Sequence, residues 1–165
     1  MSPRAACRLE MMGFEEVYDY AAGKSDWTAT GLPTEGDYAS VPRPGRVADP
    51  NLPTCSPQDL VSEVAGRPDV AAFGSCVVVS DDRIVVGRLK ESDLSAGTGA
   101  RADEVMEPGP TSVRYDEPLP DLVARMQARD VAEILVTTPG GELIGIMRRS
   151  DAERLLHELH AAHEH

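Results

Sequence analysis

Aromatic residues, cysteines and positive charges are all scarce in this sequence. Aromatic residues make up only 4% of the 165 positions, whereas hydrophobic residues make up 41%, so a core has to be built from aliphatic side chains. The three cysteines, Cys7, Cys55 and Cys76, are odd in number and form no C-x-x-C pair, which argues against a disulfide framework and a structural zinc site. Cys76 lies in an apolar run, where we expect it to pack as a small hydrophobic side chain.

The shortage of basic residues gives the chain a strongly negative charge. It has 16 Lys and Arg against 28 Asp and Glu, a formal net charge of -12. Binding to nucleic acid or to an anionic membrane is not expected, because both require a surplus of positive charge. The sequence has no apolar run of roughly 18 residues, the length that crosses a bilayer, and its first residues lack the apolar core of a signal peptide. These features are typical of a cytoplasmic protein.

One segment of the sequence occurs twice. Residues 77–93 recur 58 positions later as residues 135–151. Each copy is an apolar strand, a short polar turn, a second apolar strand that leads to a glycine, and a Ser-Asp pair that opens a helix. The correspondence extends backwards, since Thr54 aligns with Ser112. A fixed period of this kind indicates a repeat architecture. We therefore expect two structurally equivalent units across most of residues 54–156.

The spacing of apolar residues predicts the elements of each unit. In the first unit, residues 56–59 are a favourable helix start, but Gly66 and Pro68 should end that helix early and leave residues 67–74 irregular. In the second unit, apolar residues at helical spacing predict an uninterrupted helix at residues 118–129. The other predicted elements are hairpins at residues 76–86, turning at Asp81-Asp82, and at residues 134–147, short helices from Ser92 to Gly97 and at residues 102–106, and a helix at residues 150–160.

Before the repeats, the sequence predicts a small α-β-α piece followed by a linker. The piece is too short to bury a core of its own. It begins with a helix at residues 3–12, which Ser2 caps and Gly13 ends. A strand at residues 14–20 follows, and then a helix that starts at Gly23 and stops at residues 31–33. Residues 34–53, which contain several Pro and Gly residues, form the linker.

This N-terminal piece resembles the C-terminal end of a rhodanese (sulfurtransferase) domain. The catalytic cysteine of that family lies in a loop just before the helix that here begins at Pro3, so the loop is expected to be missing. Cys7 lies within the helix, where no loop of backbone N–H groups can stabilise a thiolate. We therefore expect no catalytic residue and interpret the piece as a structural remnant. The resemblance rests on Ala5-Ala6, Leu9, Gly13-Phe14, Val17-Tyr18, Gly23-Lys24, Trp27 and Gly31-Leu32-Pro33.

Two β-β-α units, each preceded by an extended segment and a helix, resemble a tandem pair of CBS domains. The period, the order of elements, Met106-Glu107-Pro108 and residues 143–146 carry this resemblance, which covers residues 47–157. It implies an α/β fold of the α+β type, in which the two units pack with pseudo-two-fold symmetry. The expected domains are a degenerate rhodanese-like segment at residues 1–36, a linker at 37–45, CBS domain 1 at 46–98, CBS domain 2 at 99–160 and a tail at 161–165.

The same resemblance implies ligand clefts that hold AMP, ADP, ATP or S-adenosylmethionine. The family motif has an aspartate six residues after a glycine, as Asp93 follows Gly87 and Asp151 follows Gly145. A carboxylate at a helix start is held by the helix dipole and can accept ribose hydroxyls, although it can equally serve only as a cap. The ligand-binding residues expected on this basis are Asp151, Ser150, Arg148, Asp93, Ser92, Lys90, Thr54 and Ser112.

Lys90 and Arg148 occupy the position where the family motif has a threonine or serine. One interpretation is that these cations bind the phosphates of an ADP- or ATP-like ligand through charge-assisted hydrogen bonds. The alternative is that the long side chains fill the cleft, so that nothing binds there. The extended segments that carry Thr54 and Ser112 would line the same clefts.

His157, His160 and His163 are spaced three residues apart near the C-terminus, a spacing that lets a helix chelate a transition metal. Exposed histidines on a fraying terminus are the commoner case, so we expect neither a metal site nor a required cofactor.

The sequence as a whole predicts a regulatory protein and not an enzyme. We expect a homodimer that binds an adenosyl ligand between its repeats and signals to an unidentified protein partner. Two alternatives stay open. One is a dimerisation or interaction module that binds no ligand, and the other is a remnant of a rhodanese-type sulfurtransferase.

Overall fold

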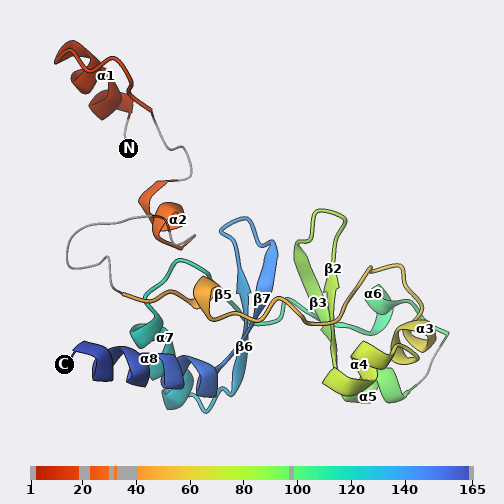
Figure 1. The fold of residues 1–165 in the computed structure, drawn as a ribbon. Coiled ribbons are helices and arrows are strands. Elements are labelled where there is room, and N and C mark those ends of the chain that lie inside the picture. Colours follow the sequence, from red (N-terminus) through yellow and green to blue (C-terminus); the bar gives the residue numbers. More distant parts are fainter. Residues whose placement is uncertain (1–2, 19–22, 30–31, 33–40, 97–98, 164–165) are drawn as a thin grey trace.

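The computed structural model describes residues 3–18, 23–29, 32, 41–96 and 99–163 of the chain. The two repeats stand side by side, each as a small sheet with its helices below it, while two N-terminal helices lie above the second repeat (Figure 1). None of the described helices is long and apolar enough to cross a membrane.

Each repeat contributes three strands that follow the same plan. A parallel pair is followed by an antiparallel hairpin, and the parallel pairs are in equivalent register, with Thr54 opposite Val77 and Ser112 opposite Leu135. A fourth short strand, β4, extends the first sheet. The strands are β1 (Thr54–Cys55), β2 (Cys76–Val79), β3 (Val85–Leu89) and β4 (Glu107–Pro108) in one sheet, and β5 (Ser112–Arg114), β6 (Glu133–Thr137) and β7 (Leu143–Arg148) in the other.

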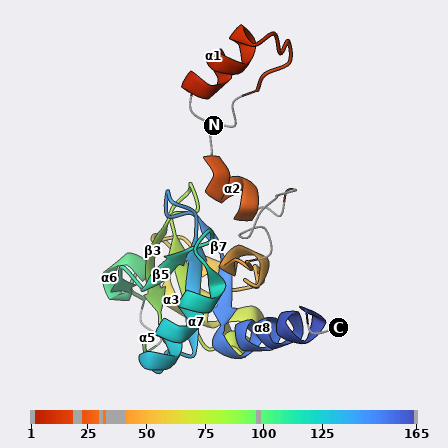
Figure 2. The same ribbon diagram turned by 90° about the vertical axis from the view of Figure 1, so that its left-hand side faces the viewer.

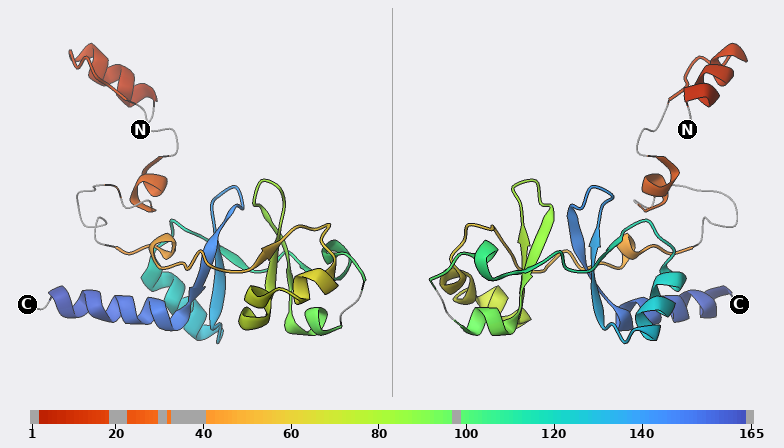
Figure 3. Two further views of the ribbon diagram at one scale, coloured as in Figure 1. Left: turned by 45° about the vertical axis from the view of Figure 1, so that its right-hand side comes forward. Right: turned by 180° about the vertical axis from the view of Figure 1, so that it is seen from behind.

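The helices of each repeat lie beside their own sheet (Figure 3). The first repeat has α3 (Val61–Ala65), α4 (Pro68–Phe73) and α5 (Glu91–Ser95). The second repeat has α7 (Leu119–Ala128) and α8 (Arg149–His163), and α6 (Ala102–Val105) precedes it. The N-terminal helices are α1 (Pro3–Met11) and α2 (Gly23–Ala29), and a short 3-10 helix, η1 (Pro44–Arg46), lies between α2 and β1.

The aliphatic core expected from the composition is present in three parts. One part lies under each sheet, and a third joins the two sheets, because Val77 comes from the first repeat while Leu135 and Ile146 come from the second. Cys76 is fully buried in the core of the first repeat, as predicted. Its hydrogen bond with Cys55 and its burial raise the pKa of the Cys76 thiol.

Equivalent residues of the two repeats contact each other at the tips of the hairpins. The backbone N–H of Val85 donates to the Gly141 carbonyl over 3.0 Å, and that of Leu143 donates to the Arg83 carbonyl over 2.9 Å. Arg83 and Gly141 are 58 positions apart, as are Val85 and Leu143. Such reciprocal contacts are what a two-fold axis produces. The predicted mixed α/β fold with pseudo-two-fold symmetry is confirmed.

Each repeat is preceded by a leading segment that pairs with the other repeat. Asp49, ahead of the first repeat, exchanges two backbone hydrogen bonds of 2.8 and 3.0 Å with Ile146 in β7. Its equivalent, Glu107 in β4, pairs with Arg88 in β3. The two repeats are therefore interlocked by exchanged strands as well as by their shared core.

Gly87 and Gly145 make room for these exchanged segments. A Cβ atom on Gly145 would lie 2.5 Å from the carbonyl oxygen of Asp49, and one on Gly87 would lie 2.7 Å from Cγ of Met106. Real Cβ atoms do not approach other atoms so closely, so a side chain is excluded at both positions unless the neighbour moves.

Several sequence predictions require correction. Residues 68–73 are helical and not irregular, because Pro68 occupies the first turn of α4, where proline is favoured. The helix predicted from residues 56–59 begins only at Val61, because the Asp59 carboxylate accepts a hydrogen bond from the Ser56 N–H and closes a turn. The strand predicted at residues 14–20 is not formed in its described part, residues 14–18. The conformation of residues 34–53, which the sequence leaves open, includes η1 and the pairing of Asp49 with β7.

Other predicted elements are present at nearly the predicted bounds, including both hairpins and helices α1, α7 and α8. The cap at Ser2, the stop of the second N-terminal helix around residues 31–33 and the break at Gly97 fall largely outside the described residues.

Candidate ligand-binding site

One pocket contains Asp151, a predicted ligand residue, and lies at the N-terminal end of α8. Asp151 is in the first turn of this helix, and its Oδ1 accepts a hydrogen bond from Arg154 Nη2 over 3.0 Å. The leading segment of the first repeat passes beside this turn, because Asp49 pairs with β7. The pocket has a volume of about 310 Å³ and is lined by Arg46, Val47, Asp151, Arg154, Leu155 and Glu158.

Two arginines and two carboxylates, those of Asp151 and Glu158, line this pocket, so it offers partners to both the hydroxyl and the phosphate groups of a ligand. Asp151 can accept hydrogen bonds from hydroxyl groups, and the positive end of the helix dipole of α8 lies beside it. Arg46 is exposed and Arg154 is mostly exposed, so both guanidinium groups can reach an anionic group at the mouth of the pocket. The volume is at the lower end of the range for small-molecule sites, about 300 to 1,000 Å³.

The equivalent position in the first repeat has a different environment. Asp93 Oδ2 accepts a hydrogen bond of 2.8 Å from the Lys90 N–H, so Asp93 caps the start of α5. Ser92 Oγ donates to Asp93 Oδ1 over 3.4 Å, and Lys90 Nζ pairs with Glu107 Oε2 over 2.7 Å. Helix α5 ends at Ser95, and the residue equivalent to Arg46 is Glu104. This side of the molecule therefore lacks both arginines.

The remaining predicted residues do not gather at Asp151. Arg148 crosses to the first repeat and lies over the ring of Phe73, 6.0 Å from its centroid, as in a weak cation–π contact. Ser150 is exposed in the same helical turn as Asp151. Ser112 lines a separate pocket of about 490 Å³ with Val113, Arg114, Asp116, Glu117 and Arg125.

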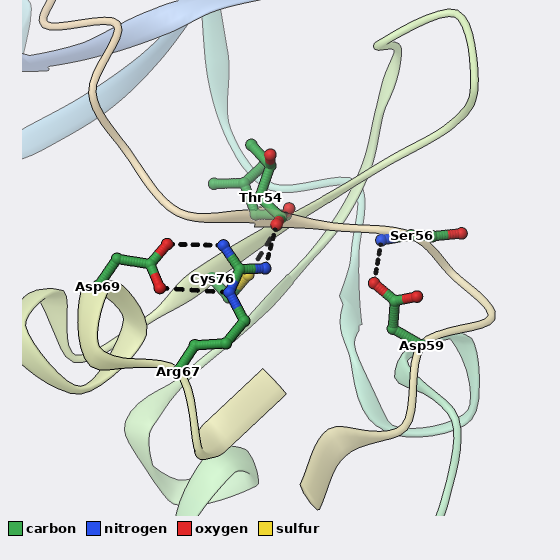
Figure 4. A network of polar contacts seen from close by, with 7 residues as sticks. Thr54, Ser56, Asp59, Arg67, Asp69 and Cys76 are labelled. Atoms are coloured by element: carbon green, nitrogen blue, oxygen red, sulfur yellow. Dashed lines mark hydrogen bonds and ion pairs between the residues drawn. The ribbon is translucent and has the colours of Figure 1, made fainter. Parts of the chain in front are cut away.

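Thr54 is part of a polar network in the first repeat (Figure 4). Its carbonyl accepts a hydrogen bond of 2.7 Å from Arg67 Nη1, and Arg67 also forms a bidentate pair with Asp69. The Arg67 guanidinium lowers the pKa of the Asp69 carboxyl. Arg67 therefore occupies the edge of β1 next to Thr54.

Sequence reasoning missed Arg46 and Arg154 as candidate ligand residues. Arg154 follows Asp151 by three positions, a spacing that places both on one helix face, so the sequence contained a signal for it. Arg46 lies before β1, and the pairing of the leading segment with β7 and the contact of Gly45 with Tyr115 bring it to the pocket.

The described histidines do not form a cluster with other metal-ligating side chains. Within the described residues, no group of three or more His, Cys, Asp or Glu side chains is placed to hold a metal ion. The Nδ1 atom of His160 lies 2.7 Å from the Leu156 carbonyl oxygen of its own helix.

The chain thus contains two interlocked β-β-α repeats related by a pseudo-two-fold axis. In each repeat an aspartate lies at the start of a helix. Residues 102–158 match the family model of the CBS domain. The second repeat is therefore a CBS domain, and the two repeats together have the fold of a CBS pair.

Solved structures of CBS-pair proteins share this fold. CBSX2 from Arabidopsis thaliana is 20% identical, with a TM-score of 0.60, over 74% of this chain and 99% of that one. CBSX2 in complex with AMP is 22% identical, with a TM-score of 0.58, over 72% of this chain and 98% of that one. The cytosolic domain of the Mg²⁺ channel MgtE in complex with ATP is 23% identical, with a TM-score of 0.58, over 71% of this chain and 50% of that one. At these identities the likeness establishes the fold alone.

A curated relative is matched over a shorter stretch. Homoserine O-acetyltransferase from Methanohalobium evestigatum is 27% identical over 84 residues, which are 49% of this chain but only 17% of the length of that protein.

Proposed function

We propose that this chain is a regulatory CBS-pair module that binds an adenine nucleotide in the pocket at Asp151 and passes the binding event to a protein partner, without catalysing a reaction itself. The observation that carries this proposal is the shared pocket of Asp151, Arg46 and Arg154. The carboxylate would accept the ribose hydroxyls, and the two guanidinium groups would bind the phosphates.

Two structural relatives support the choice of ligand class. The CBSX2 and MgtE structures contain AMP and ATP, respectively. The two arginines favour AMP, ADP or ATP over S-adenosylmethionine, because the sulfonium of the latter carries a positive charge. Binding should accordingly weaken as the salt concentration rises, since both arginines are accessible to solvent.

Isothermal titration calorimetry of the full chain with AMP, ADP, ATP and S-adenosylmethionine tests this function. Replacing Asp151 with Ala should weaken nucleotide binding roughly tenfold or more, which corresponds to about 1.4 kcal/mol. The matched control is Asp93→Ala, which removes the equivalent carboxylate of the first repeat. It should leave the dissociation constant within about twofold, provided that binding is compared at a temperature where the variant is folded.

Each other result rejects part of the proposal. If no nucleotide produces heat with the wild-type chain, the chain is better explained as an interaction module that binds no ligand. If Asp93→Ala abolishes binding and Asp151→Ala does not, the site belongs to the first repeat. Tighter binding of S-adenosylmethionine than of the nucleotides would contradict the role given to the arginines.

The proposal extends to the organisation of the chain. The domain bounds expected from the sequence place CBS domain 1 at residues 46–98 and CBS domain 2 at residues 99–160, after a rhodanese-like remnant. We place the start of the first unit at Pro44, because η1 (Pro44–Arg46) ends in the pocket residue Arg46. The protein is expected to form a homodimer, since closed two-fold pairing is the commonest arrangement of oligomers, and sedimentation equilibrium measures this directly.

A further inference from the structure

Helix α2 is docked onto the second repeat through a buried tyrosine. Tyr115, which directly follows β5, is 7% exposed, and its hydroxyl donates a hydrogen bond to the Asp26 carboxylate in α2. Helix α2 also contacts η1 and lies above it in two perpendicular views (Figure 2). The next residue of α2 is Trp27, the one tryptophan in the sequence, which is half-buried.

The same tyrosine holds η1 in place. The Gly45 N–H donates to the Tyr115 carbonyl over 3.2 Å, and a Cβ atom on Gly45 would lie 3.2 Å from Cβ of Tyr115. Next to this contact, Arg43 Nη1 donates to the Asp116 carbonyl over 3.0 Å. The backbone of η1 thus lies directly against the backbone and side chain that hold α2.

The other end of η1 forms the wall of the ligand pocket. Arg46 is its last residue, and both Arg46 and the following Val47 line the pocket at Asp151. The N–H groups of Val47 and Ala48 donate to the Pro44 carbonyl over 3.0 and 2.9 Å, which ties this wall to the start of η1. A single turn of helix therefore contacts α2 on one side and the pocket on the other.

This arrangement has no equivalent on the side of the first repeat. The residue equivalent to Tyr115 is Pro57, and its carbonyl accepts a hydrogen bond of 3.0 Å from Asp103, just as the Tyr115 carbonyl accepts one from Gly45. The backbone contact is therefore repeated, but proline has no hydroxyl group with which to hold another helix.

We propose that η1 transmits occupancy of the Asp151 pocket to helix α2, so that an anionic ligand bound to Arg46 tightens the docking of α2 on Tyr115. This inference rests on the proposed nucleotide site, and the docking of α2 is the change that nucleotide binding would control. A ligand bound to Arg46 restrains η1 further, and η1 is the surface against which α2 lies. Because coupling between two sites is reciprocal, loosening α2 must weaken ligand binding by the same factor.

Fluorescence of Trp27 tests the inference in the full chain, with AMP and ATP as the probes. Addition of nucleotide should shift the Trp27 emission to shorter wavelength, as expected for a more buried indole. Tyr115→Phe removes the hydroxyl but keeps the ring, and it should abolish this shift and weaken nucleotide binding about fivefold, the lower end of the usual range of coupling. Asp26→Asn should behave in the same way, and it tests the contact from the side of α2 should Tyr115→Phe fail to fold.

The matched control is Tyr18→Phe, which removes a hydroxyl from the same N-terminal segment. Tyr18 is 79% exposed, so this variant should change neither the Trp27 emission nor nucleotide binding. Calorimetry of the same samples separates the two levels of the argument. Heat of binding without a Trp27 response, or an undiminished response in Tyr115→Phe and Asp26→Asn, overturns the coupling and leaves the nucleotide site standing. Absence of heat with the wild-type chain overturns the site and the coupling with it.

Discussion

The two repeats share one backbone plan, yet the two equivalent aspartates have different surroundings: Asp151 lines a pocket with two arginines, whereas Asp93 caps the start of α5. Helix α8 of the second repeat continues for 15 residues, whereas its counterpart α5 ends after five. Three residues of the pocket, Arg154, Leu155 and Glu158, lie beyond the point in the helix at which α5 stops. The length of the helix therefore distinguishes the surroundings of Asp151 from those of Asp93.

The leading segments add a difference in charge. The first one brings Arg46 to Asp151, whereas the second has Glu104 at the equivalent position. Glu104 Oε2 accepts a hydrogen bond of 3.0 Å from the Arg101 N–H and so caps α6. Equivalent positions of the two leading segments therefore carry opposite charges, Arg46 at the pocket of Asp151 and Glu104 at the start of α6.

The largest difference between the repeats is expected from their glycines. Gly145→Ala should lower the free energy of unfolding by about 2 to 3 kcal/mol, because its Cβ would meet the backbone of Asp49, which cannot move without breaking two hydrogen bonds. Gly87→Ala should cost only about 1 kcal/mol, since the neighbouring Met106 side chain is flexible. Urea denaturation measures both values.

A double variant sharpens this comparison. Met106→Ala shortens the side chain next to Gly87, so it should reduce the additional cost of Gly87→Ala, whereas it should leave the cost of Gly145→Ala unchanged. Equal losses for the two single glycine variants would show that the exchanged segments are held no more tightly on one side than on the other.

The sequence predicted those parts of the fold that have a local pattern. The 58-residue period and the apolar strands predict both hairpins, and apolar residues at helical spacing predict α7. The exchange of leading segments was not predictable, because Asp49 and Glu107 pair through their backbones and carry no apolar pattern. Pro68 after Gly66 predicts a helix end, but proline is also favoured in the first turn of a helix, and in the structure Pro68 begins α4.

The candidate site was predicted in part for the same reason. Asp151 is recognisable because its motif is local, and Arg154 follows it at helical spacing. Arg46 is more than one hundred positions away in the sequence, and it reaches the pocket through non-local contacts, the pairing of Asp49 with Ile146 and the hydrogen bond of Gly45 with Tyr115. The family resemblance implies that Thr54 and Ser112 line the ligand clefts; neither lines the pocket of Asp151, and Ser112 lines a separate pocket.

A second, smaller difference concerns two equivalent arginines. Arg67→Gln should lower the free energy of unfolding by about 1 kcal/mol, because Arg67 donates a charge-assisted hydrogen bond to the Thr54 carbonyl. Its equivalent Arg125 pairs with the Glu117 carboxylate near the surface, so Arg125→Gln should cost less than about 0.5 kcal/mol. Thermal denaturation at neutral pH compares the two variants.

The pH dependence of the Arg67 effect provides a check on its cause. Arg67 lowers the pKa of Asp69 in the folded chain, so this pair stabilises the fold above the pKa of Asp69 in the unfolded chain. That part of the stabilisation is lost as the pH falls through the lower, folded value. The difference between wild type and Arg67→Gln should therefore shrink on acidification but should not vanish, because the hydrogen bond to the Thr54 carbonyl does not titrate.

A third difference is expected at the hairpin tips, where Arg83 and Gly141 occupy equivalent positions with positive φ angles of 60° and 89°. A residue with a side chain is strained in this conformation, and glycine is not, although glycine loses more backbone entropy on folding. Arg83→Gly should therefore raise the free energy of unfolding by about 0.5 kcal/mol, while Gly141→Ala should lower it by about 1 kcal/mol. Urea denaturation measures both values. The matched control is Arg83→Lys, which keeps a charged side chain at this position and should not raise the free energy of unfolding. If Arg83→Gly lowers the free energy of unfolding, the contacts of the Arg83 side chain stabilise the tip by more than its backbone strain costs, and the two tips are equivalent in backbone conformation only.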